Sequence, residues 1–332
     1  MVFKNIDMHG CSALEELPNG SYGTLRVPVA VEEHLSGNGQ AQNRNSTGIE
    51  FRFVMKGDAV KFRFAYPDGV VGMLTVYHGE FVADWPETTK MLSGECEVTI
   101  PKSRNLPTLR KLAEEHGHRF SPDVIRLVFT VRPQLVGVEG EIEPPSEEML
   151  PKKKYLAYGS SITHGSIALH SYFSYVERVA ANLSADALNL GFAGSAFLEK
   201  EMADYIAGEC EFDLATLELG INLLLHGHTP EDYEERVRYF VRRIAEGHPE
   251  AKIFAIDVYT CKSDIVGNGA AERYREILAS VLKELDLPNV IYVNGKTVLR
   301  SPDKLTTGLV HPNPDGILEM ADNLTKIIKD TV

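Results

Sequence analysis

Residues 49–66 show the clearest hydrophobic pattern in the first half of the chain. Apolar side chains recur at every second position from Ile49 to Met55 and from Val60 to Tyr66, with the turn residues 56–58 between them. A period of two is typical of half-buried β-strands, so these segments predict a hairpin. Further strands are expected at 72–85, 96–101 and 124–133, with one helix at 106–117.

These strands need a second layer to cover their apolar faces. We therefore expect residues 1–148 to form an antiparallel β-sandwich domain, jelly-roll-like in type, with a carbohydrate-binding or structural role. The polar stretch 37–48 is expected to be a mobile loop without a phosphate cradle. Residues 143–153 are rich in proline and charge, which predicts a linker, and residues 149–332 would form the second domain.

In the second half, short apolar segments alternate with segments of helical spacing. Such alternation predicts a three-layer α/β/α domain around a parallel five-stranded sheet. Thr229 and Pro230 provide the expected cap and first turn of one helix. The expected strands are 154–159, 187–194, 213–220, 252–259 and 289–295, and the expected helices are 172–184, 229–249, 271–285 and 315–330.

Four loops at the predicted carboxyl ends of these strands carry reactive or small residues. They hold Ser161, Gly194, Asn222 and His311. Ligands of parallel sheets bind at this edge, so the four residues are expected to converge. A hydroxyl, an imidazole and hydrogen-bond donors are the parts that acyl transfer requires.

In order and spacing, the four loops resemble the sequence blocks of the SGNH (GDSL-type) hydrolase family. "GSSIT" matches the first block, with Ser160 in place of the usual aspartate, and Leu223 replaces the aspartate of the third block. The resemblance covers the C-terminal half and implies a flavodoxin-like sheet. With the predicted sandwich, the chain looks like the two-domain carbohydrate esterases of this family.

The resemblance assigns a role to each of the four residues. Ser161 would be the nucleophile and His311 the general base, and the oxyanion would be held by the Ser161 N–H, the Gly194 N–H and the Asn222 amide. Each residue also has an ordinary structural interpretation as a turn or capping residue. A G-x-S-x-G nucleophile elbow is disfavoured because Thr163 stands where that motif needs glycine.

The family's acidic partner of the histidine is missing, because Gly308 occupies its position. Three alternatives follow: a backbone carbonyl of residues 307–309 orients His311, Asp303 folds back onto it, or the enzyme is weak or inactive.

Other residues are weaker candidates. His164 and His226 are expected to line the substrate site. His226 and His228 have a spacing that suits a metal, but no third ligand is evident. Trp85 could stack on a sugar, although most aromatic residues of a sandwich belong to the core.

The composition of the chain limits the classes of ligand and partner that it can bind. The formal net charge of −13 argues against nucleic acid. The cysteines at 11, 96, 210 and 261 form no metal or disulfide pattern, and neither a signal peptide nor a membrane span is visible. We expect a cytoplasmic protein that needs no metal or organic cofactor; whether it forms a homo-oligomer stays open.

The sequence thus predicts a serine esterase acting on a small ester, with an O-acetylated saccharide as the expected substrate. The alternatives are an acyltransferase with the same centre and a non-catalytic carbohydrate-binding protein. The identity of the acyl group and of the alcohol is left open.

Overall fold

The computed structural model describes residues 1–84, 89–168 and 170–331. The chain divides into two compact units, one of residues 1–29 and 43–152 and the other of residues 30–42 and 153–332. The second unit therefore includes a short segment from the N-terminal half, which a division at 148/149 does not anticipate. Trp85 lies outside the described residues.

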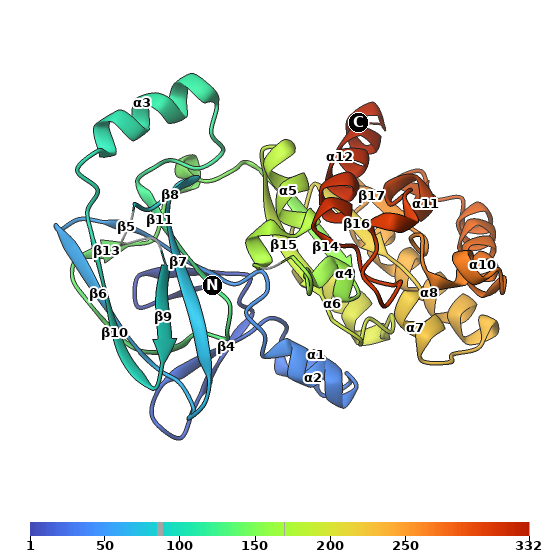
Figure 1. Cartoon of the computed structure of the whole chain (residues 1–332), viewed down its shortest axis with the longest axis horizontal. Helices are drawn as coiled ribbons and strands as arrows, with labels where there is room; N and C mark the ends of the chain where they lie inside the picture. The colour runs from blue at the N-terminus through green and yellow to red at the C-terminus, as the bar shows by residue number, and fades with distance from the viewer. Residues whose placement is uncertain (85–88, 169, 332) are drawn as a thin grey trace. The chain divides into compact units, whose positions relative to one another are not determined.

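The first unit is built from two antiparallel sheets (Figure 1). The antiparallel character predicted for this half is confirmed. One sheet contains β1 (Val2–Phe3), β2 (Ile6–His9), β5 (Glu50–Met55), β7 (Val71–His78), β8 (Phe81–Val82), β9 (Thr89–Ser93), β11 (Val124–Phe129) and β13 (Ile142–Glu143). The other contains β3 (Ala13–Glu16), β4 (Tyr22–Leu25), β6 (Ala59–Ala65), β10 (Glu95–Pro101) and β12 (Gln134–Glu139), and the predicted helix is α3 (Leu106–His116).

The hairpin predicted for residues 49–66 is wrong. Strand β5 pairs with β2, β11 and β13, whereas β6 pairs with β10 and β12 in the other sheet. The turn at 56–58 thus connects two sheets, and Phe53 meets Phe62 with ring centroids 5.2 Å apart in their shared core. Alternation reports which face of a strand is buried, but it does not identify the neighbouring strand.

The second unit contains the predicted parallel sheet, with strands in the order β15-β14-β16-β17-β18. This α/β architecture is confirmed, and the order is the flavodoxin-like 2-1-3-4-5 arrangement. The strands are β14 (Lys153–Gly159), β15 (Ala185–Gly191), β16 (Leu214–Glu218), β17 (Lys252–Ile256) and β18 (Val290–Val293).

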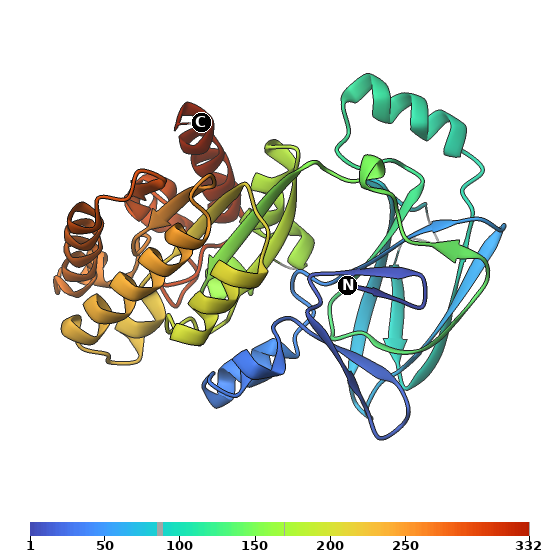
Figure 2. The ribbon, with the colours of Figure 1, turned by 180° about the vertical axis from the view of Figure 1, so that it is seen from behind.

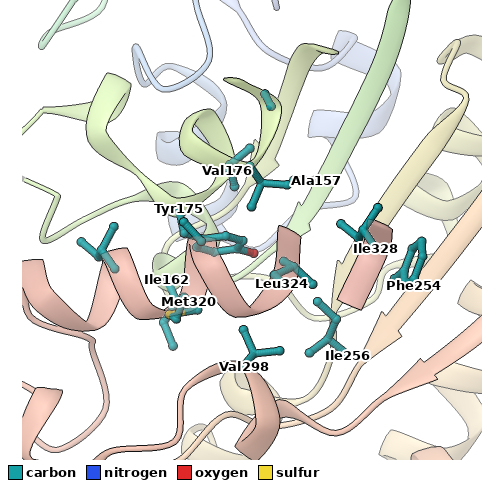
Figure 3. Packing of buried hydrophobic residues seen from close by; sticks show 14 of the residues in the cluster. Ala157, Ile162, Tyr175, Val176, Phe254, Ile256, Val298, Met320, Leu324 and Ile328 are labelled. Carbon is teal, nitrogen blue, oxygen red and sulfur yellow. The ribbon is translucent and has the colours of Figure 1, made fainter. Parts of the chain in front are cut away.

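Helices cover both faces of this sheet, as Figures 1 and 2 show from opposite sides. On one face, Ala157 and Phe254 of the sheet pack with Tyr175 and Met320 of the covering helices (Figure 3). On the other face, Tyr158 contacts Phe240 of α8. The longer helices are α5 (Tyr175–Asn182), α6 (Lys200–Glu209), α8 (Pro230–Gly247), α10 (Ala270–Leu285) and α12 (Pro314–Thr331), and the shorter ones are α4 (Ser161–His164), α7 (Ile221–Leu225), α9 (Lys262–Val266) and α11 (Gly295–Val298).

Most of these elements match the sequence-based expectation. Thr229 caps α8 through a hydrogen bond from the Asp232 N–H, and Pro230 lies in its first turn, as predicted. Helix α6 was not predicted. In the segment that was expected to be a mobile loop, residues Gly37–Asn43 form helix α2, which follows α1 (Val29–Glu32).

The strand order determines where a ligand can bind. Connections leave β14 in one direction towards β15 and then return past it to β16, so the direction of winding changes between β14 and β16. Loops diverge at such a point and leave a crevice at the carboxyl edge of the sheet. Ser161 follows β14 and Asn222 follows β16, so both lie at the carboxyl edge of the sheet, one after each of the two strands at this point.

Two further findings concern the chain as a whole. The four cysteines are free thiols. Within the described residues, each helix is too short or too polar to cross a bilayer.

Candidate active site

Ser161 is the first residue of the short helix α4, directly after β14. The preceding residue, Ser160, caps this helix by accepting a hydrogen bond from the Ile162 N–H at 3.2 Å. The helix lies very close to the neighbouring strand β15. A Cβ atom at Gly191 would come within 2.2 Å of the backbone nitrogen of His164. Glycine at 191 therefore permits the close approach that holds the Ser161 turn against the sheet.

The Ser161 hydroxyl meets the imidazole predicted to activate it. Its Oγ lies 2.7 Å from Nε2 of His311, which is 150 positions later in the chain. This is hydrogen-bond distance, so an unprotonated Nε2 can accept the hydroxyl proton. Partial burial lowers the pKa of His311, which favours the neutral ring that a general base requires.

Backbone contacts fix the loop that carries His311. A β-bridge joins Leu305 to Pro312, and the Thr306 N–H donates to the His311 carbonyl at 2.8 Å. The Lys262 N–H donates to the Leu309 carbonyl at 2.7 Å, so the loop after β17 supports the same segment. Backbone hydrogen bonds before and after His311 therefore fix the position of its imidazole.

Asp303 does not complete a triad. It lies in the exposed turn 302–304 and forms no hydrogen bond with His311. The carbonyls of residues 307–309 do not accept from the ring either: within residues 1–84, 89–168 and 170–331, Ser161 is the only hydrogen-bond partner of the His311 side chain. The bridge at Leu305–Pro312 closes the loop that carries His311, and Asp303 precedes this loop in the chain. The centre is a Ser–His pair.

Three hydrogen-bond donors were expected to form the oxyanion site, and each has a defined local geometry. The Asn222 Oδ1 accepts from the Ala196 N–H at 3.0 Å, which orients the amide and leaves its Nδ2 hydrogens unused. Ser161 contributes the first N–H of α4, a position without an intrahelical acceptor. Gly194 has φ of +66°, a conformation that glycine adopts without strain. In the part of the chain that the structure describes, these N–H groups have no protein acceptor.

The two histidines predicted to line the site differ in their surroundings. His164 is only 8% exposed, and its Nδ1 lies 3.1 Å from the carbonyl oxygen of Gly191, so this nitrogen faces backbone and not a ligand. His226 is exposed, with its ring centroid 5.1 Å from that of Phe197. Phe197 follows Ala196, so His226 lies beside the loop that orients Asn222.

The Nδ1 of the nearby His228 lies at hydrogen-bond distance from the Asp232 carboxyl group. Among the residues that the structure describes, no group of three or more His, Cys, Asp and Glu side chains is arranged to hold a metal ion. The metal interpretation of His226 and His228 therefore gains no third ligand.

A comparison with known families agrees with this geometry. Residues 157–317 match the model of the GDSL-like Lipase/Acylhydrolase family, and this range includes all four predicted site residues. Residues 157–317 belong to the GDSL-like lipase/acylhydrolase family. The resemblance drawn from the four loops is thus confirmed. No curated protein sequence is similar enough to match the chain.

Solved structures share the fold of the whole chain. The salicylyl-acyltransferase SsfX3 from a tetracycline biosynthetic pathway has 18% identity and a TM-score of 0.76, over 99% of this chain and 96% of that one. A family two carbohydrate esterase from Cellvibrio japonicus has 16% identity and a TM-score of 0.57, over 99% and 95%. The acetyl xylan esterase Est2A from the rumen bacterium Butyrivibrio proteoclasticus has 13% identity and a TM-score of 0.59, over 99% and 96%.

Glu218 is a component of the GDSL-like domain that the sequence analysis missed. Its carboxylate is 3% exposed and accepts hydrogen bonds from the Ser160 N–H (2.9 Å), the Ser160 hydroxyl (2.5 Å), the Thr163 N–H (3.3 Å) and the Thr163 hydroxyl (2.6 Å). Burial raises the pKa of Glu218, and the hydrogen bonds from Ser160 and Thr163 oppose this shift. The carboxylate joins both residues that flank the Ser161–Ile162 step. A lone acid in the apolar strand segment 214–219 was the available signal.

Asn38 is a second residue that supports the site and was not predicted from the sequence. It belongs to the segment 30–42, which is part of the second unit. Its Nδ2 donates to the Ala193 carbonyl at 2.7 Å, and a Cβ atom at Gly194 would lie 3.1 Å from the same nitrogen. Asn38 therefore supports the loop that presents the Gly194 N–H. No local sequence pattern connects position 38 with this loop.

Proposed function

We propose that the protein is a serine esterase that cleaves small carboxylic esters through an acyl-enzyme. The observation that carries this proposal is the 2.7 Å distance between Ser161 Oγ and His311 Nε2, inside a domain of the GDSL-like lipase/acylhydrolase family. Acyl transfer also requires that the negative charge developing on the carbonyl oxygen be stabilised, and we propose the Ser161 N–H, the Gly194 N–H and the Asn222 amide for this role.

The reaction begins when His311 Nε2 accepts the proton of Ser161 as Oγ bonds to the acyl carbon. The Ser161 N–H, the Gly194 N–H and the Asn222 amide donate to the resulting oxyanion. The C–O bond to the alcohol then breaks, and His311 returns the proton to the departing alkoxide. Water repeats the sequence on the acyl-enzyme, which releases the acid and restores the Ser161 hydroxyl.

For the substrate, we propose an acetyl ester of a saccharide. Support comes from the fold shared with carbohydrate esterases, among them an acetyl xylan esterase and a Clostridium thermocellum enzyme whose structure contains cellohexaose. The proposed role of the first unit is to bind the saccharide or to support the second unit.

Acyl transfer to an alcohol is the second candidate function. The observation that favours it is the likeness to a salicylyl-acyltransferase over nearly the whole length of both chains. Hydrolysis and transfer share the acyl-enzyme and differ in the group that attacks it. The ratio of transfer product to free acid, measured with and without added alcohols, distinguishes them.

The test uses p-nitrophenyl acetate and a fluorophosphonate probe. Parent protein should release p-nitrophenol and be labelled at Ser161, whereas Ser161→Ala should lose at least about 1,000-fold in kcat and all labelling. Ser166→Ala is the matched control, since this serine is exposed in the same loop. Equal hydrolysis by the parent and Ser161→Ala would exclude the proposed nucleophile, and parent protein without labelling or turnover would favour a non-catalytic binding protein.

A further inference from the structure

A pocket of about 310 Å³ lies in the second unit, among the segments that follow β16 and β17 and the segment that precedes His311. Ile221 and Val310 both line it, and each is the immediate chain neighbour of a site residue: Ile221 precedes Asn222, and Val310 precedes His311. The pocket therefore begins one residue away from an oxyanion donor and one residue away from the general base. A substrate whose carbonyl lies between these two groups can extend a substituent into it.

The walls of this pocket are largely apolar. Besides Ile221 and Val310, they include the apolar residues Leu224, Leu225 and Val266, together with the polar residues Lys262, Ser263 and Asn268. Leu225 is 55% exposed and Val266 is 56% exposed, which is unusual for two large apolar side chains bordering one cavity. Single exposed apolar residues are ordinary, but a group of them around a concave surface is typical of a binding site.

The wall formed by the loop after β17 is held rigidly. Arg275, which is 2% exposed, donates to the Asp264 carboxylate at 2.7 Å and to the Val258 carbonyl at 2.9 Å. The Lys262 N–H bonds the Leu309 carbonyl and joins this loop to the one that carries His311. Because this wall is already ordered, ligand binding costs less conformational entropy than it would with a flexible wall.

We propose that this pocket binds an apolar group of the ester substrate, aliphatic or aromatic. At about 30 Å³ for each water-sized group, its volume admits a substituent of about ten non-hydrogen atoms. The inference rests on the proposed esterase function but departs from a simple acetylated saccharide: the ester carries an apolar arm, either as an acyl group larger than acetyl or as a substituent of the alcohol.

Two ester series identify the side that carries the arm. One series keeps p-nitrophenol and lengthens the acyl chain from acetyl to octanoyl. The other keeps acetate and lengthens the alcohol from methanol to octanol. We expect kcat/KM to rise about fourfold per methylene in one of them until the pocket is filled. If neither series shows a rise, the proposal is overturned.

Substitutions at two adjacent residues test whether the apolar arm binds in this pocket. Val266→Asp places a carboxylate in the pocket, whereas Ile265→Asp makes the same change at a neighbour that is 46% exposed but does not line it. For the responsive series, Val266→Asp should lower the ratio of long-chain to short-chain kcat/KM by at least about tenfold. Ile265→Asp should leave this ratio within about twofold of the parent. Equal effects of the two variants would contradict the assignment.

Binding separates failure of this inference from failure of the proposed function. If the parent hydrolyses no ester, the same comparison is made by calorimetry of p-nitrophenyl hexanoate binding to Ser161→Ala, alone and combined with either Asp substitution. Binding that is weakened by Val266→Asp and not by Ile265→Asp supports the pocket without any catalysis. Binding that neither substitution weakens overturns it.

Discussion

The carboxylate of Glu218 accepts hydrogen bonds from both the N–H and the hydroxyl of Ser160. Ser160 occupies the position at which the GDSL block usually has aspartate. In this chain a buried acidic side chain at the end of the neighbouring strand β16 is linked to the turn that carries Ser161 through this serine. Glu218 acts as a positioning residue because it contacts the residues on each side of the nucleophile and not the nucleophile itself.

Glu218→Gln should lower kcat about ten- to a hundredfold, because a small displacement of Ser161 relative to His311 is costly for the reaction. An amide can accept at only one end, so buried donors of Ser160 and Thr163 lose their partner, at about 1–3 kcal/mol of unfolding free energy. Turnover and chemical denaturation are to be measured together. Asp257→Asn is the control: it is also a buried acid after a strand, and it accepts from the Gly295 N–H and the Tyr292 hydroxyl. If both variants lose stability but neither loses kcat, Glu218 has no positioning role.

Substitution of Asn222 should affect kcat much more than KM. Asn222→Ala removes an oxyanion donor, for which a loss of about 100- to 1,000-fold is expected. Asn222→Asp separates this role from the support of Ala196, because its carboxylate still accepts the Ala196 N–H but has no hydrogen to donate. Both variants should be inactive to a similar degree. An active Asn222→Asp would show that the contact with Ala196, and not the donor, is what matters.

The acid limb of the kcat/KM–pH profile should have its midpoint below 6.5. Only neutral His311 can accept the Ser161 proton, and burial without a facing carboxylate lowers the pKa of this ring. Activity is therefore lost as pH falls through that lowered value and is retained at a pH where an unperturbed histidine would already be half protonated. A midpoint above 6.5 would indicate an acidic partner of His311.

Gly308→Asp extends this test by restoring the acid of the family block. The backbone can accept the side chain: a Cβ atom at 308 would meet only the Thr306 hydroxyl oxygen, at 4.0 Å. A carboxylate that reaches the second ring nitrogen should raise the pKa of His311, move the acid limb to higher pH and increase kcat by about tenfold. Asp303→Asn serves as the reference and should leave the profile unchanged, since Asp303 does not contact His311.

Asn38→Ala should reduce kcat by several-fold while Ser161 keeps its reactivity towards a fluorophosphonate. The substitution frees the Ala193 carbonyl and loosens the loop that presents the Gly194 N–H, but it leaves the Ser161–His311 pair untouched. Gln40→Ala, two positions further along α2, provides a comparison within the same helix. If both variants behave alike, the effect belongs to the helix as a whole and not to the Asn38 contact.

The parallel sheet could be predicted because each of its strands is a short apolar run followed by a clear break, and such strands end at one edge. Because the loops that hold Ser161, Asn222 and His311 follow these strands, the sequence predicts that the three residues lie at this edge, and the Ser161–His311 contact agrees with the prediction. The pairing of β5 and β6 could not be predicted, since Phe53 and Phe62 alternate in the same way whether their strands are neighbours in a sheet or face each other across a core. Glu218 and Asn38 could not be predicted for a related reason. Glu218 contacts Ser160 and Asn38 contacts Ala193, and such tertiary contacts leave no periodic signal in the sequence.

The distance of 150 positions between Ser161 and His311 has a consequence for biosynthesis. When the ribosome has completed β14 and α4, the growing chain contains the Ser161 hydroxyl. His311, the proposed general base, has not yet been translated. Chains that terminate after α4 but before position 311 would therefore contain the proposed nucleophile but lack the proposed general base.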